Sequence, residues 1–197
     1  MQDSSGETVD AGGPTESLSA TLATAFLGCR ASAAWQIEVR RGLRPTPAAV
    51  EDPHGELVAR KGREHEATCL ADMRERCGDV TRIANGAWPA RVAATVAAMT
   101  RGTPLIYQAA LADTPWIGFA DFLVRVASPC PHWAWSYEPW DAKLARSPRP
   151  EHLLQIALYG DLLATVQGRS AAQGWLMLGT GDHAVPSGSS DGTILFG

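Results

Sequence analysis

The spacing of apolar residues divides the chain into helical and strand-like segments. Apolar positions three or four residues apart predict helices, and short apolar runs rich in β-branched and aromatic residues predict strands. The predicted helices cover residues 19–44, 53–76, 88–101 and 151–166. The predicted strands cover residues 79–84, 105–111, 116–126, 133–144 and 174–178. A turn at Asp113-Thr114-Pro115 is expected to join the second and third of these strands as a β-hairpin.

This order of elements predicts an α/β fold with a central mixed β-sheet flanked by helices, preceded by an N-terminal helical region. The predicted domain covers residues 18–182. Residues 1–17 are polar and acidic, and we expect them to be disordered. Residues 183–197 are rich in Gly and Ser, and we expect them to form a flexible C-terminal tail.

Composition narrows the class of protein. No apolar run is long enough to span a bilayer, and residues 1–14 lack the basic and apolar parts of a signal peptide. We therefore expect a cytoplasmic protein with no membrane partner. The four cysteines form no Cys-x-x-Cys pair, which argues against a zinc knuckle. The net charge of −4 argues against an extended coat on nucleic acid, but it allows a local basic groove.

One of the few lysines lies in a pattern that suggests chemistry. The chain has fifteen Arg and only two Lys, and Lys143 follows Asp141 at the end of a predicted strand. Side chains two residues apart leave a strand on the same face. A second acid, Asp121, is isolated in the apolar run 116–126, where an unpaired charge is costly to bury. Two such carboxylates can hold Mg²⁺, and a neighbouring ammonium can stabilise the charge that develops during phosphodiester hydrolysis.

These signals have ordinary structural alternatives. About one Asp-x-Lys triplet is expected by chance in a chain of this size, and a solvated strand edge would explain it. A nearby arginine could pair with Asp121 in place of a metal ion. Glu138 is three residues from Asp141, so we expect it to point to the other face of the strand, with at most a supporting role.

Two helices carry further candidates. Gln155 and Tyr159 are four residues apart, so they share one helical face that can lie over the strand ends. An ordinary helix surface with one amphipathic tyrosine is the alternative. His65 lies on the helix predicted for residues 53–76, and an isolated histidine can equally serve a structural role.

The order of these residues resembles a known family. A helical His65, then Gly118-x-x-Asp121, then Asp141-x-Lys143, then Gln155-x-x-x-Tyr159 is similar to the RecB-like branch of the PD-(D/E)xK nucleases. The resemblance is closest to RecB-like nucleases of actinobacteria and covers residues 18–182. It implies a restriction-endonuclease-like core.

The resemblance also implies roles for the candidate residues. His65, Asp121 and Asp141 would be ligands of Mg²⁺ or Mn²⁺, and Lys143 would be the catalytic lysine. Gln155 and Tyr159 would position either the substrate strand or the β-strand that carries Lys143.

Basic residues next to this constellation are candidates for contacts with DNA. Arg146 and Arg149 follow Lys143 closely and could bind phosphate groups. Each of them could equally be an ordinary solvated charge.

Many relatives hold an iron–sulfur cluster, with one Cys ahead of the helical His and three more near the C-terminus. Cys29 stands where the first of these would be, but Cys69, Cys77 and Cys130 do not match the later three in position or spacing. We therefore expect no cluster. The resemblance is to the N-terminal nuclease part of these family members, so it implies a helicase or further domains as partners.

The resulting prediction is a metal-dependent deoxyribonuclease that acts on single-stranded DNA or DNA ends in repair, recombination or defence against foreign DNA. The main alternative is a non-catalytic nucleic-acid-binding or assembly module that keeps the fold. A third possibility is a metal-dependent hydrolase of small phosphoesters, which would need a closed pocket.

Overall fold

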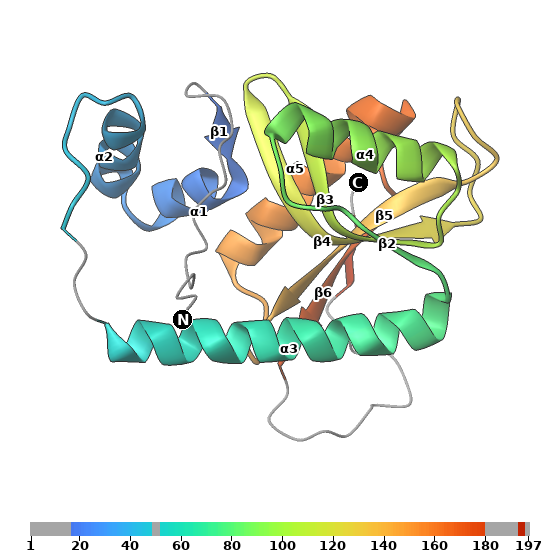
Figure 1. Cartoon of the computed structure of the whole chain (residues 1–197), viewed down its shortest axis with the longest axis horizontal. Helices are drawn as coiled ribbons and strands as arrows, with labels where there is room; N and C mark the ends of the chain where they lie inside the picture. The colour runs from blue at the N-terminus through green and yellow to red at the C-terminus, as the bar shows by residue number, and fades with distance from the viewer. Residues whose placement is uncertain (1–16, 49–51, 180–192, 196–197) are drawn as a thin grey trace, which may run out of the picture.

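The computed structural model describes residues 17–48, 52–179 and 193–195, and its centre is a seven-stranded mixed β-sheet (Figure 1). Six strands follow the order β2-β3-β4-β5-β6-β7, and β1 pairs separately with β4. Adjacent strands are parallel in β1–β4, β2–β3 and β5–β6, and antiparallel elsewhere. The strands are β1 Leu18–Ser19, β2 Val80–Arg82, β3 Leu105–Asp113, β4 Trp116–Val126, β5 Ser136–Lys143, β6 Gln173–Leu178 and β7 Thr193–Leu195. The predicted α/β fold with a mixed sheet is confirmed.

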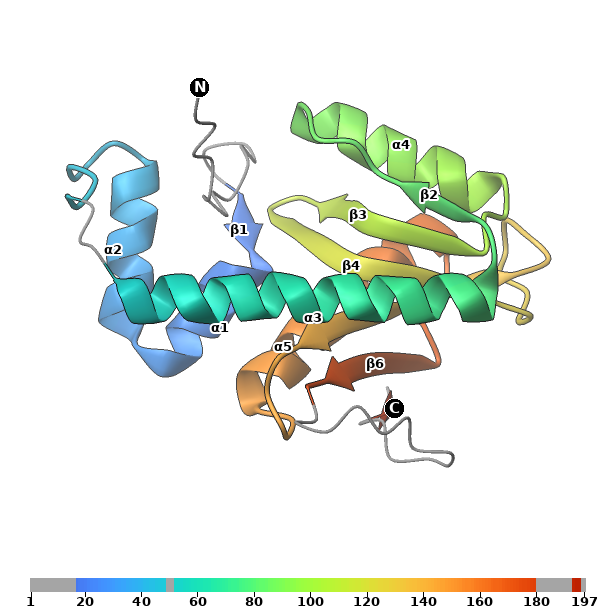
Figure 2. The ribbon, with the colours of Figure 1, turned by 60° about the horizontal axis from the view of Figure 1, so that its bottom comes forward.

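Helices cover both faces of this sheet. They are α1 Ala20–Gly28, α2 Arg30–Arg40, α3 Pro53–Cys77, α4 Trp88–Thr100 and α5 Pro150–Gln167. Helix α3 runs across one face of the sheet (Figure 2), where its Cys69 and Met73 pack in a core with Phe122 of β4. Helices α4 and α5 supply a second core, in which Met99 and Leu163 are fully buried. Within the described ranges, no helix combines the length and the apolar content that crossing a bilayer requires.

The N-terminal helical region differs from the prediction. A single helix over residues 19–44 is wrong, because the chain forms two helices that meet at Cys29, whose backbone is extended. The break follows Gly28, a residue type with low helix propensity. The Ser19 side chain caps α1 by accepting a hydrogen bond from the Leu22 amide.

Most other boundaries agree with the predicted elements. The hairpin of β3 and β4 turns at Thr114-Pro115. The predicted strand over residues 133–144 begins only at Ser136, and Trp135 instead donates its indole N–H to the Met99 carbonyl of α4. The predicted disordered segment 1–17 lies outside the described residues except for Ser17. Of the predicted tail 183–197, only Thr193–Leu195 is described, and it pairs with β6.

In the β3–β4 hairpin, the side chains switch from one face of the sheet to the other at Gln108 and Asp121. By register, Tyr107 is opposite Phe122 and Ala109 is opposite Ala120, so these two pairs would share a face in a regular sheet. The first pair instead belongs to the core under α3, and the second to the core under α4 and α5. Gln108 has a φ of 58°, a strained conformation for a residue other than glycine. The local reversal therefore coincides with the position of Asp121.

Strands β4 and β5 also separate at this point. In chain order, Phe122 is the first residue of β4 that pairs with β5. Earlier in β4, Trp116 and Ile117 pair with β1 on the same edge. In the described structure, residues 118–121 pair with neither strand on that edge. The Asp121 carboxylate bridges the separation by accepting a hydrogen bond from the Ala142 amide, at 2.8 Å. We call this separation the fork.

Candidate functional site

Two carboxylates and one ammonium meet at the fork. Asp141 is almost fully buried, with 2% of its side chain exposed, and its Oδ2 lies 2.6 Å from Lys143 Nζ. The two opposite charges form an ion pair. Lys143 keeps 22% of its side chain exposed, so its ammonium can reach a ligand from solvent. The two side chains share one face of β5, as their spacing predicts.

The electrostatics of the fork favour a bound cation. The pKa of Asp121 is raised well above its ordinary value, first by burial and then by the negative charges of Asp141 and Glu66. The Ala142 amide and Lys143 lower it without cancelling these effects. A single ammonium is therefore insufficient to neutralise the acids. Because hard divalent cations prefer carboxylate oxygens, the two aspartates are the residues here that could hold Mg²⁺ or Mn²⁺.

Helix α5 brings Gln155 and Tyr159 to the same place. The Gln155 amide Nε2 donates to the Tyr159 hydroxyl at 2.6 Å, so the pair shares a helical face as predicted. Tyr159 is 3% exposed. Burial and then the charges of Asp141 and Asp121 raise the pKa of its phenol well above the ordinary value, so the hydroxyl stays protonated at neutral pH.

Gly118 explains how Tyr159 comes so close to β4. A Cβ atom at this glycine would lie 2.7 Å from Cε1 of the tyrosine ring and 3.2 Å from Leu162 Cδ1. Real Cβ contacts are not that short, so any side chain at position 118 would push α5 away from the sheet. The glycine of the Gly-x-x-Asp pattern therefore has a packing role beside the fork.

His65 is not brought into a metal-binding group. Its Nε2 lies 2.9 Å from the Met177 carbonyl of β6 and 3.5 Å from Cys69 Sγ. Across the described ranges, no three His, Cys, Asp or Glu side chains are grouped closely enough to hold a metal ion. The role of His65 as a metal ligand stays a prediction. The geometry supports only Asp121 and Asp141 as candidate metal ligands.

Glu66, the next residue on α3, was missed in the sequence. Its Oε1 accepts hydrogen bonds from the Tyr107 hydroxyl at 2.8 Å and from Gln108 Nε2 at 2.5 Å. Burial and then the bond to Glu66 raise the pKa of Tyr107 to about 12. Gln108 is the signal in the sequence that could have led to Glu66, because an isolated amide in an apolar strand needs a hydrogen-bond partner just as Asp121 does.

His152 is a second residue near the fork that the sequence did not single out. It lies in the first turn of α5, and its Nδ1 is buried without a hydrogen-bond partner among the described residues. Burial and then the positive charge of Lys143 lower its pKa, so the ring is neutral at neutral pH.

The other predicted residues lie at the periphery. Arg146 and Arg149 are exposed in the connection between β5 and α5, and Arg149 is 3.9 Å from Glu151. Glu138 lies on the α3 side of β5, where its Oε2 accepts a hydrogen bond from Trp175 Nε1. Cys29 is an exposed free thiol, at the junction of α1 and α2.

The chain matches no protein-family model, and no curated protein matches it in sequence.

Proposed function

We propose that the chain is a metal-dependent nuclease that hydrolyses the phosphodiester bonds of DNA, on a restriction-endonuclease-like core of the RecB type. The observation that carries the proposal is the ion pair of Lys143 with the buried Asp141, beside Asp121 at the fork. Buried charges are rarely left so poorly neutralised unless a ligand completes the site.

Asp121 and Asp141 would hold the metal ion, through oxygens that receive few hydrogen bonds from the protein. Such an ion supplies positive charge for the phosphate oxygens and makes water a nucleophile at neutral pH. Lys143 is partly exposed, so its ammonium can turn from Asp141 toward the scissile phosphate and stabilise the negative charge of the transition state.

Gln155 and Tyr159 would orient the substrate. The Tyr159 oxygen accepts a hydrogen bond from Gln155, which leaves the phenolic proton free to be donated. A phosphate oxygen of the bound strand is a suitable acceptor. Arg146 and Arg149 would add contacts to the DNA backbone that fix position and carry no sequence information.

In this proposal the enzyme acts on single-stranded DNA or DNA ends in repair, recombination or defence against foreign DNA. A helicase, or further domains, would deliver such ends to it.

A non-catalytic nucleic-acid-binding module is the second candidate, and one observation favours it. The Nε2 of His65 is engaged by a backbone carbonyl, and the described residues contain no group of three metal ligands. A module of this kind would bind DNA without cleaving it and would tolerate the loss of either aspartate.

The test is a cleavage assay with single-stranded DNA, double-stranded DNA, RNA and a small phosphodiester, each in Mg²⁺, Mn²⁺ or EDTA. The proposal predicts degradation of DNA that requires the metal ion. A folded chain that binds DNA but leaves it intact in every metal would establish the binding module. Cleavage of the small phosphodiester alone would establish a small-molecule phosphoesterase.

A further inference from the structure

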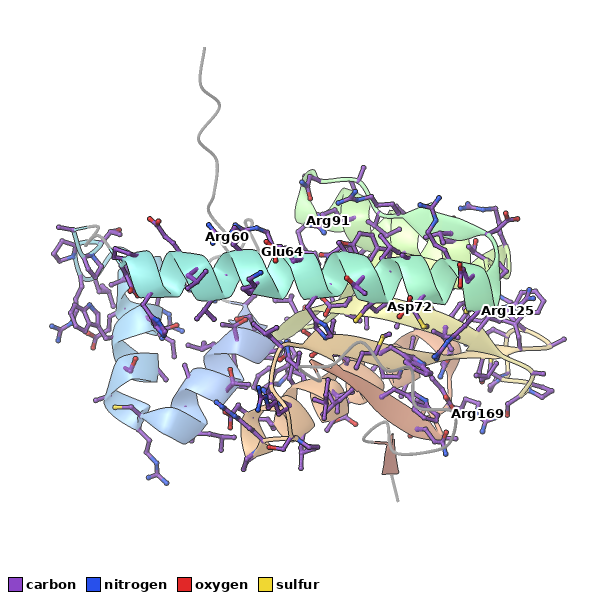
Figure 3. All side chains as sticks on the ribbon, turned by 90° about the horizontal axis from the view of Figure 1, so that it is seen from below. Arg60, Glu64, Asp72, Arg91, Arg125 and Arg169 are labelled. Carbon is purple, nitrogen blue, oxygen red and sulfur yellow. The ribbon has the colours of Figure 1, made fainter. Side chains whose placement is uncertain are left out.

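Two side chains in the first turn of α4 are buried with an N–H group that has no acceptor. Trp88 and Arg91 are each 5% exposed. Within the described residues, the indole Nε1 of the first and the guanidinium Nε of the second make no hydrogen bond. No carboxylate in the described ranges forms an ion pair with Arg91, whose position on α4 is labelled in Figure 3. Because arginine is almost never buried unless it is paired, this charge requires an explanation.

Phe119 of β4 holds both groups in place. The Arg91 Cζ lies 3.9 Å from the centroid of its ring, a cation–π contact. The ring of Trp88 packs edge-on against the same phenyl ring, with the centroids 4.5 Å apart. Stacking on an aromatic face leaves the charge of the guanidinium without an anionic partner. Burial lowers the pKa of Arg91, which agrees with a charge that the protein does not compensate.

A small cavity of about 50 Å³ adjoins this cluster. Trp88 and Phe119 line it together with Ser19, Ala20 and Thr21, which form the start of α1. The N-terminus of a helix carries partial positive charge and favours anions. Among the described residues, no acidic side chain lines the cavity. Trp88, whose indole N–H has no acceptor there, lines the cavity, and the charge of Arg91 lies against Phe119, another lining residue. A free N–H donor and a nearby positive charge both favour an anion.

The cavity shares one wall with the fork. Tyr159 lines it beside Gly118, while the charges of Asp141 and Asp121 act on the phenol of the same tyrosine. An anion in the cavity would therefore lie next to the position proposed for the scissile phosphate.

We propose that this cavity, bounded by Trp88, Phe119, Tyr159 and the start of α1, is a subsite for a backbone phosphate of the nucleic acid, next to the phosphate that is cleaved. N–H donors and helix N-termini commonly contact nucleic-acid phosphates, and the charge of Arg91 behind Phe119 would favour an anion here. That the phosphate belongs to DNA rests on the proposed function, whereas the phosphate site itself rests on the cavity, the unpaired Trp88 N–H and the neighbouring Arg91 charge.

The first test measures binding of a fluorescent single-stranded oligonucleotide in EDTA, so that cleavage does not interfere. Trp88→Phe removes the N–H and keeps most of the ring, and Arg91→Gln removes the charge. We expect each to weaken binding about 5- to 10-fold, and Arg91→Gln to lower the slope of log K against log salt by about one. The matched controls are Trp35→Phe, at an exposed position on α2, and Arg101→Gln, at the other end of α4.

Thermal unfolding separates this subsite from a structural role. Removal of an unpaired buried charge should leave the melting temperature of Arg91→Gln equal to or above that of the wild type. A structural arginine would lower it. This comparison also carries the test if Trp88→Phe does not fold.

Inorganic phosphate distinguishes failure of the subsite from failure of the proposed function. We expect phosphate to raise the melting temperature of the wild type and to have little effect on either variant. A phosphate effect without DNA binding would support the subsite and contradict the nuclease. Folded variants that bind the oligonucleotide as tightly as the wild type, with no phosphate effect in any protein, would overturn the subsite and leave the nuclease proposal standing.

Discussion

On one side of Tyr159 the protein has too much negative charge, and on the other side it has an unpaired positive charge. At the fork, a single lysine faces Asp121 and the buried Asp141. Next to the cavity beyond the tyrosine, Arg91 is buried against Phe119, with no carboxylate partner in the described structure. In our proposals, each region binds a ligand of opposite sign. A divalent cation and a phosphate would satisfy both at once.

Such poorly neutralised groups lower stability, and natural proteins keep them mainly at functional sites. Substitutions in either region should therefore affect activity and the free energy of unfolding differently. The changes below are ordered from the largest expected effect to the smallest.

Asp141→Asn should abolish most activity while the fold persists. The substitution removes the charge that pairs with Lys143 and would hold the cation, so we expect the initial rate of DNA cleavage to fall at least about 100-fold. Asp72→Asn, at an exposed position on α3, is the control and should cleave at the wild-type rate. Equal rates in the two variants would show that the fork is not catalytic.

Gly118→Ala should disturb both regions together, because its Cβ would meet the ring of Tyr159 at 2.7 Å. We expect the free energy of unfolding to fall by about 2 kcal/mol, a typical cost of overpacking. Both cleavage and phosphate protection should weaken. Gly86→Ala, whose Cβ would enter open space, should change none of these quantities. A fully active and stable Gly118→Ala variant would refute the role of this close approach.

Tyr159→Phe should reduce kcat about 10-fold with little loss of stability, because the hydroxyl is proposed to act on the substrate. Gln155→Leu should add little to that loss, since the two side chains form one hydrogen-bonded unit. Tyr137→Phe gives the contrast. That hydroxyl donates to the Thr103 carbonyl at 2.8 Å, so its removal should cost about 1 kcal/mol of stability and no activity.

Asp121→Asn should stabilise the metal-free protein at neutral pH. Because the pKa of this carboxyl is raised on folding, its protonated form stabilises the native state below the ordinary carboxyl pKa, and that contribution is lost as pH rises through the folded pKa. We expect a gain of about 1 kcal/mol at pH 7, falling toward zero below about pH 4. Denaturant unfolding in EDTA measures it.

Addition of Mg²⁺ provides the counterpart of that experiment. A cation bound to the native state should raise the melting temperature of the wild type and leave Asp121→Asn unchanged. If the variant is less stable than the wild type in EDTA, then Asp121 has a partner that compensates its charge, and the comparison of the two regions fails.

Patterns local to one element could be predicted from the sequence. The period of a strand placed Asp141 and Lys143 on one face, and the period of a helix did the same for Gln155 and Tyr159. Asp121 was noticed because an apolar strand makes an isolated charge conspicuous.

Features that depend on packing between distant elements could not be predicted. His65 follows the expected order of residues, yet its ring contacts a carbonyl of β6, and spacing along the chain carries no information about that contact. Trp88 and Arg91 look like ordinary members of an alanine-rich helix until Phe119 packs against both. The reversal at Gln108 depends on a backbone angle that residue type alone does not set.

Because the chain contains only two lysines, the most direct test compares the loss of one with the loss of the other. Lys143→Ala and Lys61→Ala remove the same group, the first from the fork and the second from an exposed ion pair with Glu64 on α3. Both proteins would be incubated with labelled single- and double-stranded DNA in Mg²⁺ or Mn²⁺, beside the wild type and an EDTA control. The account predicts metal-dependent degradation by the wild type and Lys61→Ala, and none by folded Lys143→Ala. Degradation by Lys143→Ala at the wild-type rate, or a folded wild type that leaves DNA intact, would contradict it.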